Sequence, residues 1–253
     1  MTNSTTAYPM LKSPLSENRT LTGTILPVAQ LQPSHTQQMF DLLSDYFLNV
    51  TRARFENDLS EKESAILLLD VNGDVKGFST LMRICKVVDG QNVVAFFSGD
   101  TIVAREHWNE SELPRVWSRH VFAEAAKVRD GRAYWFLISS GYKTYRFLSV
   151  FYREFFPSFR GETPRFELRV LDALAFQKFP REYDCERGVV RFAEPTPLRN
   201  GVATISENRL SDPHVAFFLK ANPHHADGDE LACLTELTPE NLTPAGRRMV
   251  GLQ

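Results

Sequence analysis

The sequence predicts an α/β (α+β) fold with a mixed, twisted sheet, in which an antiparallel meander leads into a parallel strand–helix–strand pair. Two apolar runs rich in strand-forming residues, 93–103 and 133–138, supply the parallel pair. Between them, side chains recur at the spacing of an amphipathic helix: Leu113, Val116, Trp117, His120, Val121 and Ala125. A second stripe predicts a helix that ends at Pro157: Leu148, Phe151, Tyr152 and Phe155. A crossover of this length makes the strands parallel, so their carboxyl ends lie at one edge of the sheet, where such sheets bind ligands.

Antiparallel strands are expected ahead of this pair. The runs 65–71 and 75–88 are separated by Asn72-Gly73-Asp74, where Asn-Gly accepts the positive φ of a hairpin turn. A second turn at Asp89-Gly90 leads into the first parallel strand. Three elements are expected before the meander: a strand within 21–31 and helices near 33–47 and 50–59.

Composition limits the class of protein. The chain has 253 residues, a formal net charge of -2 and a pI of about 6.3, which disfavours a nucleic-acid partner. Its three cysteines lack the spacing of a disulfide framework or a zinc site: Cys85, Cys185 and Cys233. No apolar run approaches the roughly 20 residues of a membrane helix, and the N-terminus has no leader pattern, so we expect a cytoplasmic protein without a membrane partner. The 19 phenylalanines fit either a thick aromatic core or the lining of an apolar tunnel.

Three regions are expected along the chain. Residues 1–20, rich in Ser, Thr, Asn and Pro, predict a flexible arm, and residues 21–157 hold the core. Residues 158–253 form an extension that completes the sheet and roofs the cleft, with a strand at 229–237. Five polar residues gather in this extension without the spacing of metal ligands: His224, His225, Asp227, Asp229 and Glu230. We therefore expect a polar loop there and no metal.

The order of these elements resembles that of the GNAT superfamily of acyl-CoA-dependent N-acetyltransferases, over residues 21–157. In that family a strand ending in Val-x-Pro is followed by a glycine-rich turn that opens a helix. Val103-Ala104-Arg105 and residues 108–113 hold the corresponding positions here. The family's last helix often carries a phrase like Leu-Tyr-Glu-Lys-Leu-Gly-Phe, which corresponds to residues 151–157. The resemblance implies transfer of an acyl group from a CoA or acyl-carrier-protein thioester to an amine or hydroxyl of a small acceptor.

The same resemblance implies where the donor binds. It places seven residues along the donor: Val103, Trp108, Asn109, Ser111, Arg115, Ser139 and Ser140. This turn departs from the family because it lacks glycine and carries Glu110 and Glu112, which repel phosphate. A helix capped by Asn109, with Glu112 as the capping-box partner, would account for these two residues without any ligand. Arg115 is either a cation that compensates for the two glutamates or part of a solvated helix face. We expect acyl-CoA or acyl-phosphopantetheine as co-substrate, with weak affinity for acetyl-CoA and better use of a longer acyl group on an acyl carrier protein.

Acyl transfer needs a base for the amine and an acid for the leaving thiolate. By the resemblance, Tyr152 holds the position of the acid, and its alternative reading is an amphipathic core tyrosine. Asp100 is the candidate base because it follows Gly99, and an interior strand glycine often marks a bulge; the alternative is a plain bend. His107 and His120 are further base candidates, although His120 lies on the apolar stripe of its helix.

Two other functions compete with acyl transfer by a thioester-dependent enzyme. The glycine-free turn favours a non-catalytic GNAT-fold binding or regulatory module. Transfer from an aminoacyl-tRNA is disfavoured by the net charge of -2.

Overall fold

The computed structural model describes residues 21–202 and 204–252, so the arm expected at residues 1–20 lies outside the described residues. One mixed sheet has the strand order β1-β2-β3-β4-β5-β8-β7-β6. Its strands are β1 (Thr22–Pro27), β2 (Ser64–Leu69), β3 (Val75–Val88), β4 (Gln91–Val103), β5 (Arg132–Ser139), β6 (Tyr183–Asp184), β7 (Val189–Val190) and β8 (Glu230–Glu236). The helices are α1 (Pro33–Tyr46), α2 (Arg52–Ser60), α3 (Glu112–Ala125), α4 (Tyr142–Phe151), α5 (Arg165–Lys178), α6 (Glu207–Leu210), α7 (Pro213–Ala221) and α8 (Pro244–Val250).

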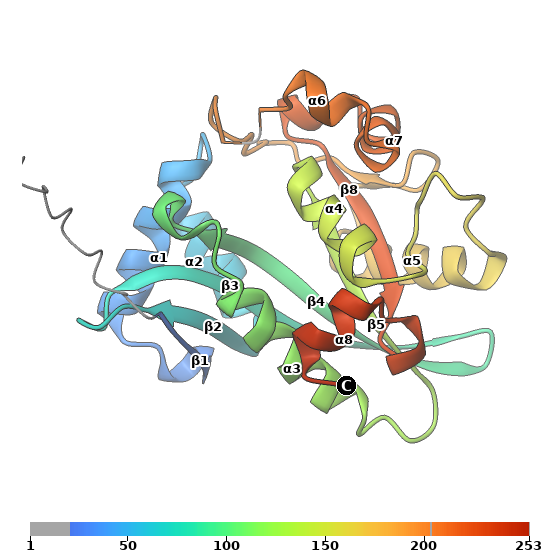
Figure 1. Cartoon of the computed structure of the whole chain (residues 1–253), viewed down its shortest axis with the longest axis horizontal. Helices are drawn as coiled ribbons and strands as arrows, with labels where there is room; N and C mark the ends of the chain where they lie inside the picture. The colour runs from blue at the N-terminus through green and yellow to red at the C-terminus, as the bar shows by residue number, and fades with distance from the viewer. Residues whose placement is uncertain (1–20, 203, 253) are drawn as a thin grey trace, which may run out of the picture.

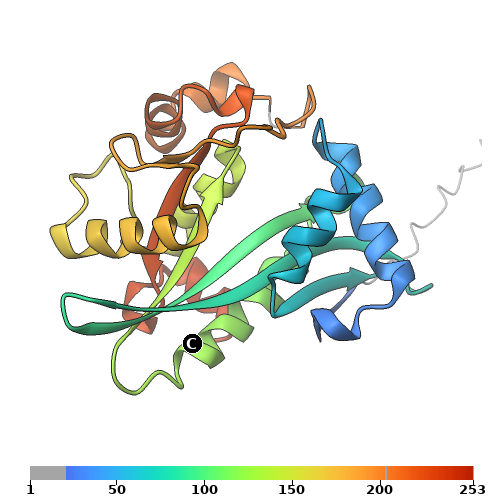
Figure 2. The same ribbon diagram turned by 180° about the vertical axis from the view of Figure 1, so that it is seen from behind.

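Helices cover both faces of the sheet. α3, α4, α7 and α8 lie on one face, towards the viewer in Figure 1, where their apolar side chains pack around Trp117 and Trp135. α1, α2 and α5 lie on the other face, seen in Figure 2. Many phenylalanines are buried in these layers, including Phe78, Phe97 and Phe136. The aromatic core is therefore confirmed. Within the described residues, no helix has the length and apolar character needed to cross a membrane.

The predicted parallel pair is confirmed. β4 pairs with β5 in parallel from Val93–Arg132 to Ser98–Leu137. β1 to β4 form the antiparallel meander, and β8 adds to β5 in the antiparallel sense. Pairing between β4 and β5 stops at Ser98, although β4 continues to Val103 and β5 to Ser139. The two strands therefore separate at their carboxyl ends.

A β-bulge in β4 lies at this point of separation. Ser79 pairs with Thr101 and Leu81 with Ser98, so Gly99 and Asp100 together oppose the single residue Thr80. The extra residue reverses the alternation of side chains along the strand. Before the bulge Phe96 packs under α3 and α4, whereas after it the even-numbered Ile102 packs with α1 and α2. The bulge thus turns Asp100 towards the face that carries α2.

Two expected helix boundaries are wrong. α4 ends at Phe151, not at Pro157, because the chain becomes extended and Phe156 exchanges backbone hydrogen bonds of 2.8 and 2.7 Å with Leu234 of β8. α3 begins at Glu112 with Ser111 as its N-cap residue, which makes no side-chain cap bond. The hairpin turn at Asn72-Gly73 is confirmed, since Gly73 has a φ of +84°.

Candidate active site

Two carboxylates lie at the carboxyl ends of the separated strands. Asp100 follows the bulge of β4, and Glu230 is the first residue of β8. The neighbouring Leu231 pairs with Ser139 at the end of β5, so the two carboxylates flank the last residues of that strand. Neither forms an ion pair with any residue in 21–202 or 204–252. A half-buried carboxylate without a paired cation is costly to keep in a fold, which singles out this place.

Burial changes the acidity of both groups. Desolvation, together with the charge of Asp58, raises the pKa of Asp100 from 3.8 to about 6, against the opposing effects of Lys62, Arg54 and Lys178. Desolvation also raises the pKa of Glu230 from 4.5 to about 7; a hydrogen bond from Ser140 opposes this effect, and the charge of Asp100 adds to it. Near neutral pH, Asp100 is mostly ionised while Glu230 retains a proton part of the time.

A buried lysine packs against the bulge on the face of the sheet that carries α2. Lys62 follows α2, and its side chain is 0% exposed. Its Nζ lies 2.5 Å from Asp58 Oδ2 and 5.8 Å from the centre of the Phe97 ring. Lys178 of α5 lies 3.6 Å from the other oxygen of Asp58, which ties α2 and α5 together beneath β4.

Gly99 has no room for a side chain. A methyl group there would overlap the Thr80 hydroxyl and lie 2.7 Å from Lys62 Cε. The Thr80 hydroxyl is itself buried without a hydrogen-bond partner. Close packing of Thr80 and Lys62 against the bare backbone therefore fixes the bulge that orients Asp100.

The predicted donor-binding residues divide into two groups. Ser140 joins the carboxylates through Glu230, and the buried Ser139 hydroxyl donates to the Gly141 carbonyl at 2.9 Å, closing the turn into α4. Val103 ends β4, and its carbonyl accepts a 2.8 Å hydrogen bond from Trp108 Nε1. Ser111 and Arg115 lie apart from these, at the start of α3.

Side chains at the start of α3 already hydrogen-bond to one another. Arg115 donates to Glu112 at 2.9 Å and to the Ser111 hydroxyl at 3.1 Å. Asn109 is exposed and lies before the N-cap residue, so the predicted capping box of Asn109 with Glu112 is wrong. Ser and Asn are both good N-cap residues, and the chain places Ser111 in that position.

Tyr152 lies on the opposite face of the sheet from Asp100. It is the C-cap residue of α4, is 1% exposed, and packs 5.8 Å from Trp135 between ring centres. Burial raises the pKa of its phenol well above the ordinary value. The structure therefore brings together Asp100 and Ser140, and adds Glu230, but leaves Tyr152 in the core beneath α4.

Glu230 was noticed in the sequence only as a member of a polar loop. Its place beside Ser139 depends on the pairing of β8 with β5, which joins segments about a hundred residues apart. His107, a further base candidate, is buried and lies 2.6 Å from Glu110. Within the described ranges, no group of three or more His, Cys, Asp or Glu side chains is arranged to hold a metal ion.

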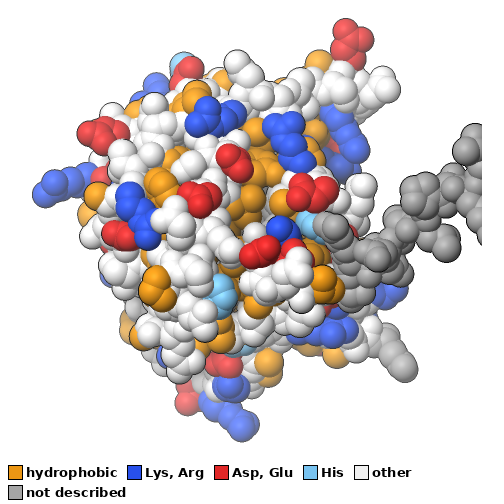
Figure 3. Space-filling view, turned by 90° about the vertical axis from the view of Figure 1, so that its left-hand side faces the viewer, with side chains coloured by type: hydrophobic (Ala, Val, Ile, Leu, Met, Phe, Trp, Pro, Cys, Tyr) orange, Lys and Arg blue, Asp and Glu red, His pale blue; other side chains and the backbone are white. Residues whose placement is uncertain are grey.

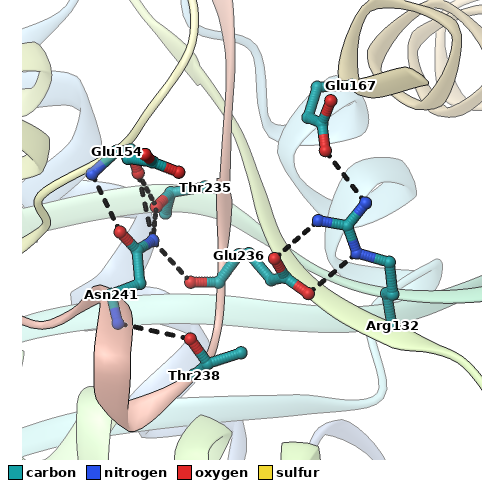
Figure 4. A network of polar contacts seen from close by, with 7 residues as sticks. All are labelled: Arg132, Glu154, Glu167, Thr235, Glu236, Thr238 and Asn241. Carbon is teal, nitrogen blue, oxygen red and sulfur yellow. Dashed lines mark hydrogen bonds and ion pairs between the residues drawn. The ribbon is translucent and has the colours of Figure 1, made fainter. Parts of the chain in front are cut away.

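A separate pocket of about 290 Å³ lies at the other end of β5. Figure 4 shows the polar network formed mainly by residues of its lining. Arg132 binds both oxygens of Glu236, at 2.8 and 2.6 Å, and also binds Glu167 at 2.9 Å. Asn241 is bonded to Glu154, Thr235 and Glu236. These polar groups satisfy one another, so the network fastens α5, β5 and β8 together and is not the candidate active site.

No protein-family model and no curated protein matches the chain. It is similar to a probable N-acyltransferase of Enterococcus faecalis, with 18% identity over 53% of this chain and 33% of that one and a TM-score of 0.39. It is similar to the GNAT-family N-acetyltransferase YhbS of Escherichia coli in complex with CoA, with 14% identity over 52% and 70% of the two chains and a TM-score of 0.38. NAA60 of Arabidopsis thaliana in complex with a bisubstrate analogue matches at 14% identity over 55% and 88%, with a TM-score of 0.39. The chain thus spans about a third of the Enterococcus faecalis protein and aligns through about half of its own length.

Proposed function

We propose that this chain, whose fold is of the GNAT type, is an acyltransferase that moves an acyl group from a thioester to an amine of a small acceptor. One observation carries the proposal: a bulge holds the unpaired carboxylate of Asp100 where two parallel strands separate. An acyl donor entering between the strands would bring its thioester next to that carboxylate.

Asp100 suits the role of base. An acceptor amine is protonated in water and attacks a carbonyl only after losing a proton. With a pKa of about 6, Asp100 is ionised at neutral pH and is a stronger base than an ordinary aspartate. Asp100 takes the proton of the bound ammonium and passes it to water, so that the neutral nitrogen can attack the acyl carbon. As the carbon–nitrogen bond forms, the nitrogen gives its second proton to the ionised Asp100, and the carbon–sulfur bond breaks.

The departing thiolate needs a proton in turn. From the family resemblance we keep Tyr152 as a proposed acid, which requires the donor sulfur to reach its buried hydroxyl on the face opposite Asp100. Glu230 is the second candidate, because its pKa of about 7 leaves it partly protonated. Two carboxyl groups with raised and different pKa values are a common acid–base arrangement. Glu230 also accepts a hydrogen bond from Ser140, which steadies it at the end of β5.

The donor is an acyl-CoA or an acyl-phosphopantetheine on a carrier protein, and the acceptor carries an amine or, less simply, a hydroxyl. On the face shown in Figure 3, acidic and basic side chains are interspersed, which fits a small acceptor better than a nucleic acid. We also infer a reducing, cytoplasmic compartment, because Cys85, Cys185 and Cys233 are all free thiols.

The test is thiol release by the purified protein with a panel of acyl-CoA and acyl-carrier-protein donors and a panel of amines. Asp100→Asn is expected to lower the rate about 10²- to 10⁴-fold. Asp130→Asn, an exposed aspartate in the turn before β5, is the matched control and should not change it. Turnover that is the same in the wild type and Asp100→Asn would remove Asp100 from the mechanism.

A non-catalytic binding module is the second candidate function. The turn before α3 favours it, because this turn lacks the family's glycines and carries Glu110 and Glu112, which repel phosphate. Such a module would retain an acyl-CoA without releasing thiol. Intact mass spectrometry of the purified protein with the same donors, beside the thiol assay, separates the two functions.

A further inference from the structure

Two positive side chains lie against the same exposed indole at the mouth of the separated strands. Arg105 belongs to the 3-10 turn that follows β4, and Lys143 is the second residue of α4, which follows β5. Lys143 Nζ lies 3.9 Å from the centre of the Trp108 ring, and Arg105 Cζ lies 5.6 Å from it. The pair therefore spans the gap between the two strand ends.

The indole is held in place independently of these cations. Its Nε1 donates to the Val103 carbonyl at 2.8 Å, and its ring lies 6.1 Å from the Tyr46 ring. Lys143 is anchored as well, since its Nζ donates to the Val202 carbonyl at 3.0 Å. The indole and the charge of Lys143 are thus held in fixed positions.

Neither cation has a carboxylate partner among the described residues, in contrast to its neighbours. Arg115 pairs with Glu112, and Arg146 of α4 pairs with Asp212. Burial and the charge of Arg105 lower the pKa of Lys143, which shows that the two charges repel each other. A positive charge in the first turn of a helix is also unfavourable, because that end of the helix is itself positive. A cation–π contact at an exposed site is weakly stabilising, so an anion that neutralises the pair explains the arrangement better.

We propose that Arg105 and Lys143, which both lie against Trp108, bind the phosphate of the acyl donor. The inference rests on the proposed function and moves the phosphate from the start of α3, where Arg115 is already paired, to the space between β4 and α4. Val103 lies three residues beyond Asp100 in β4, a distance of about 10 Å along the strand. A donor whose phosphate lies at Trp108 can extend its arm along β4 and place its thioester near Asp100.

The experiment uses the full chain and three ligands that share the pantetheine arm. Pantetheine has no phosphate, phosphopantetheine adds one, and CoA adds a second together with 3′-phosphoadenosine; inorganic pyrophosphate is a probe that carries no arm. Calorimetry measures the affinity of each ligand. Binding beside the exposed Trp108 should change its fluorescence, and Trp108→Phe shows how much of the signal comes from the buried Trp117 and Trp135. Arg105→Gln and Lys143→Met are each expected to weaken CoA and phosphopantetheine about 10-fold and to leave pantetheine unchanged. Lys143→Arg should restore most of the affinity.

Lys127→Met, an exposed lysine just beyond the end of α3, is the matched control and should have no effect. Arg115→Gln tests the alternative phosphate site at the start of α3. Loss of affinity in Arg115→Gln but not in the two variants would place the phosphate at α3 and overturn the inference, with thiol release still supporting the acyltransferase. Absence of any phosphate-dependent binding to the wild type would also overturn it. Phosphate-dependent binding that needs Arg105 and Lys143, in a protein that never releases thiol, would support this site and contradict the proposed enzyme.

Discussion

Replacing Asp100 with asparagine should make the folded protein more stable at pH 8 and add nothing near pH 4. In the folded protein the pKa of Asp100 is raised from 3.8 to about 6, mainly by desolvation. A raised pKa means that the folded state holds its proton more tightly than the unfolded state. The stabilising contribution of that proton is complete below about pH 4 and is lost as the pH rises through about 6.

The size of the effect follows from the two pKa values. At about 1.4 kcal/mol for each pH unit between them, the ionised carboxylate lowers the free energy of unfolding by at most about 3 kcal/mol at pH 8. Asparagine has a similar size and cannot ionise. The difference in unfolding free energy between variant and wild type should therefore grow by up to about 3 kcal/mol between pH 4 and pH 8.

Urea unfolding followed by circular dichroism at several pH values measures this difference. Only the change in the difference with pH is diagnostic, because any packing effect of asparagine is the same at every pH. Asp130→Asn serves as the control, since water solvates that exposed carboxylate. A difference that stays constant from pH 4 to pH 8 would show that Asp100 is fully hydrated, and the reasoning about its basicity would be refuted.

Three further predictions concern the same site. For thiol release, kcat/KM should rise as the pH increases through about 6, because Asp100 must be ionised, and Asp100→Asn should lose this limb of the profile. If Tyr152 is the acid, Tyr152→Phe should lower turnover about 10²-fold with little loss of stability. Unchanged turnover in this variant, together with lower turnover in Glu230→Gln, would make Glu230 the group that protonates the leaving thiolate. Gly99→Ala should destabilise the protein by about 1–3 kcal/mol in urea unfolding, because the new methyl group meets Thr80 and Lys62. Gly161→Ala is its control, since nothing lies within 4 Å of a methyl group there, and equal effects of the two variants would contradict the packing argument.

Local patterns were enough to predict the parts of the fold that local chemistry determines. The apolar runs at 93–103 and 133–138 and the helical stripe between them predicted the parallel pair, and Gly99 indicated a bulge beside Asp100. Both features are present, because strand propensity, crossover length and the lack of a side chain at Gly99 all act within a short segment.

The features that the sequence patterns did not predict depend on contacts between segments far apart in the chain. The stripe through Phe155 is helical in spacing, yet Phe156 pairs with Leu234 and pulls the chain out of the helix after Phe151. The same strand β8 carries Glu230 to the end of β5, and no local signal in the polar loop before it indicates that neighbour. Lys62 likewise reaches the bulge only because α2 packs beneath β4.

Hydrogen–deuterium exchange with and without a non-hydrolysable acyl-CoA analogue tests most directly whether the donor binds between β4 and β5. We expect slower exchange of the backbone amides in residues 99–108 and 139–144 when the analogue is bound, and no change around Arg132 and Glu236. Slower exchange confined to the pocket at Arg132, or no change at the ends of β4 and β5 at saturating ligand, would contradict this expectation.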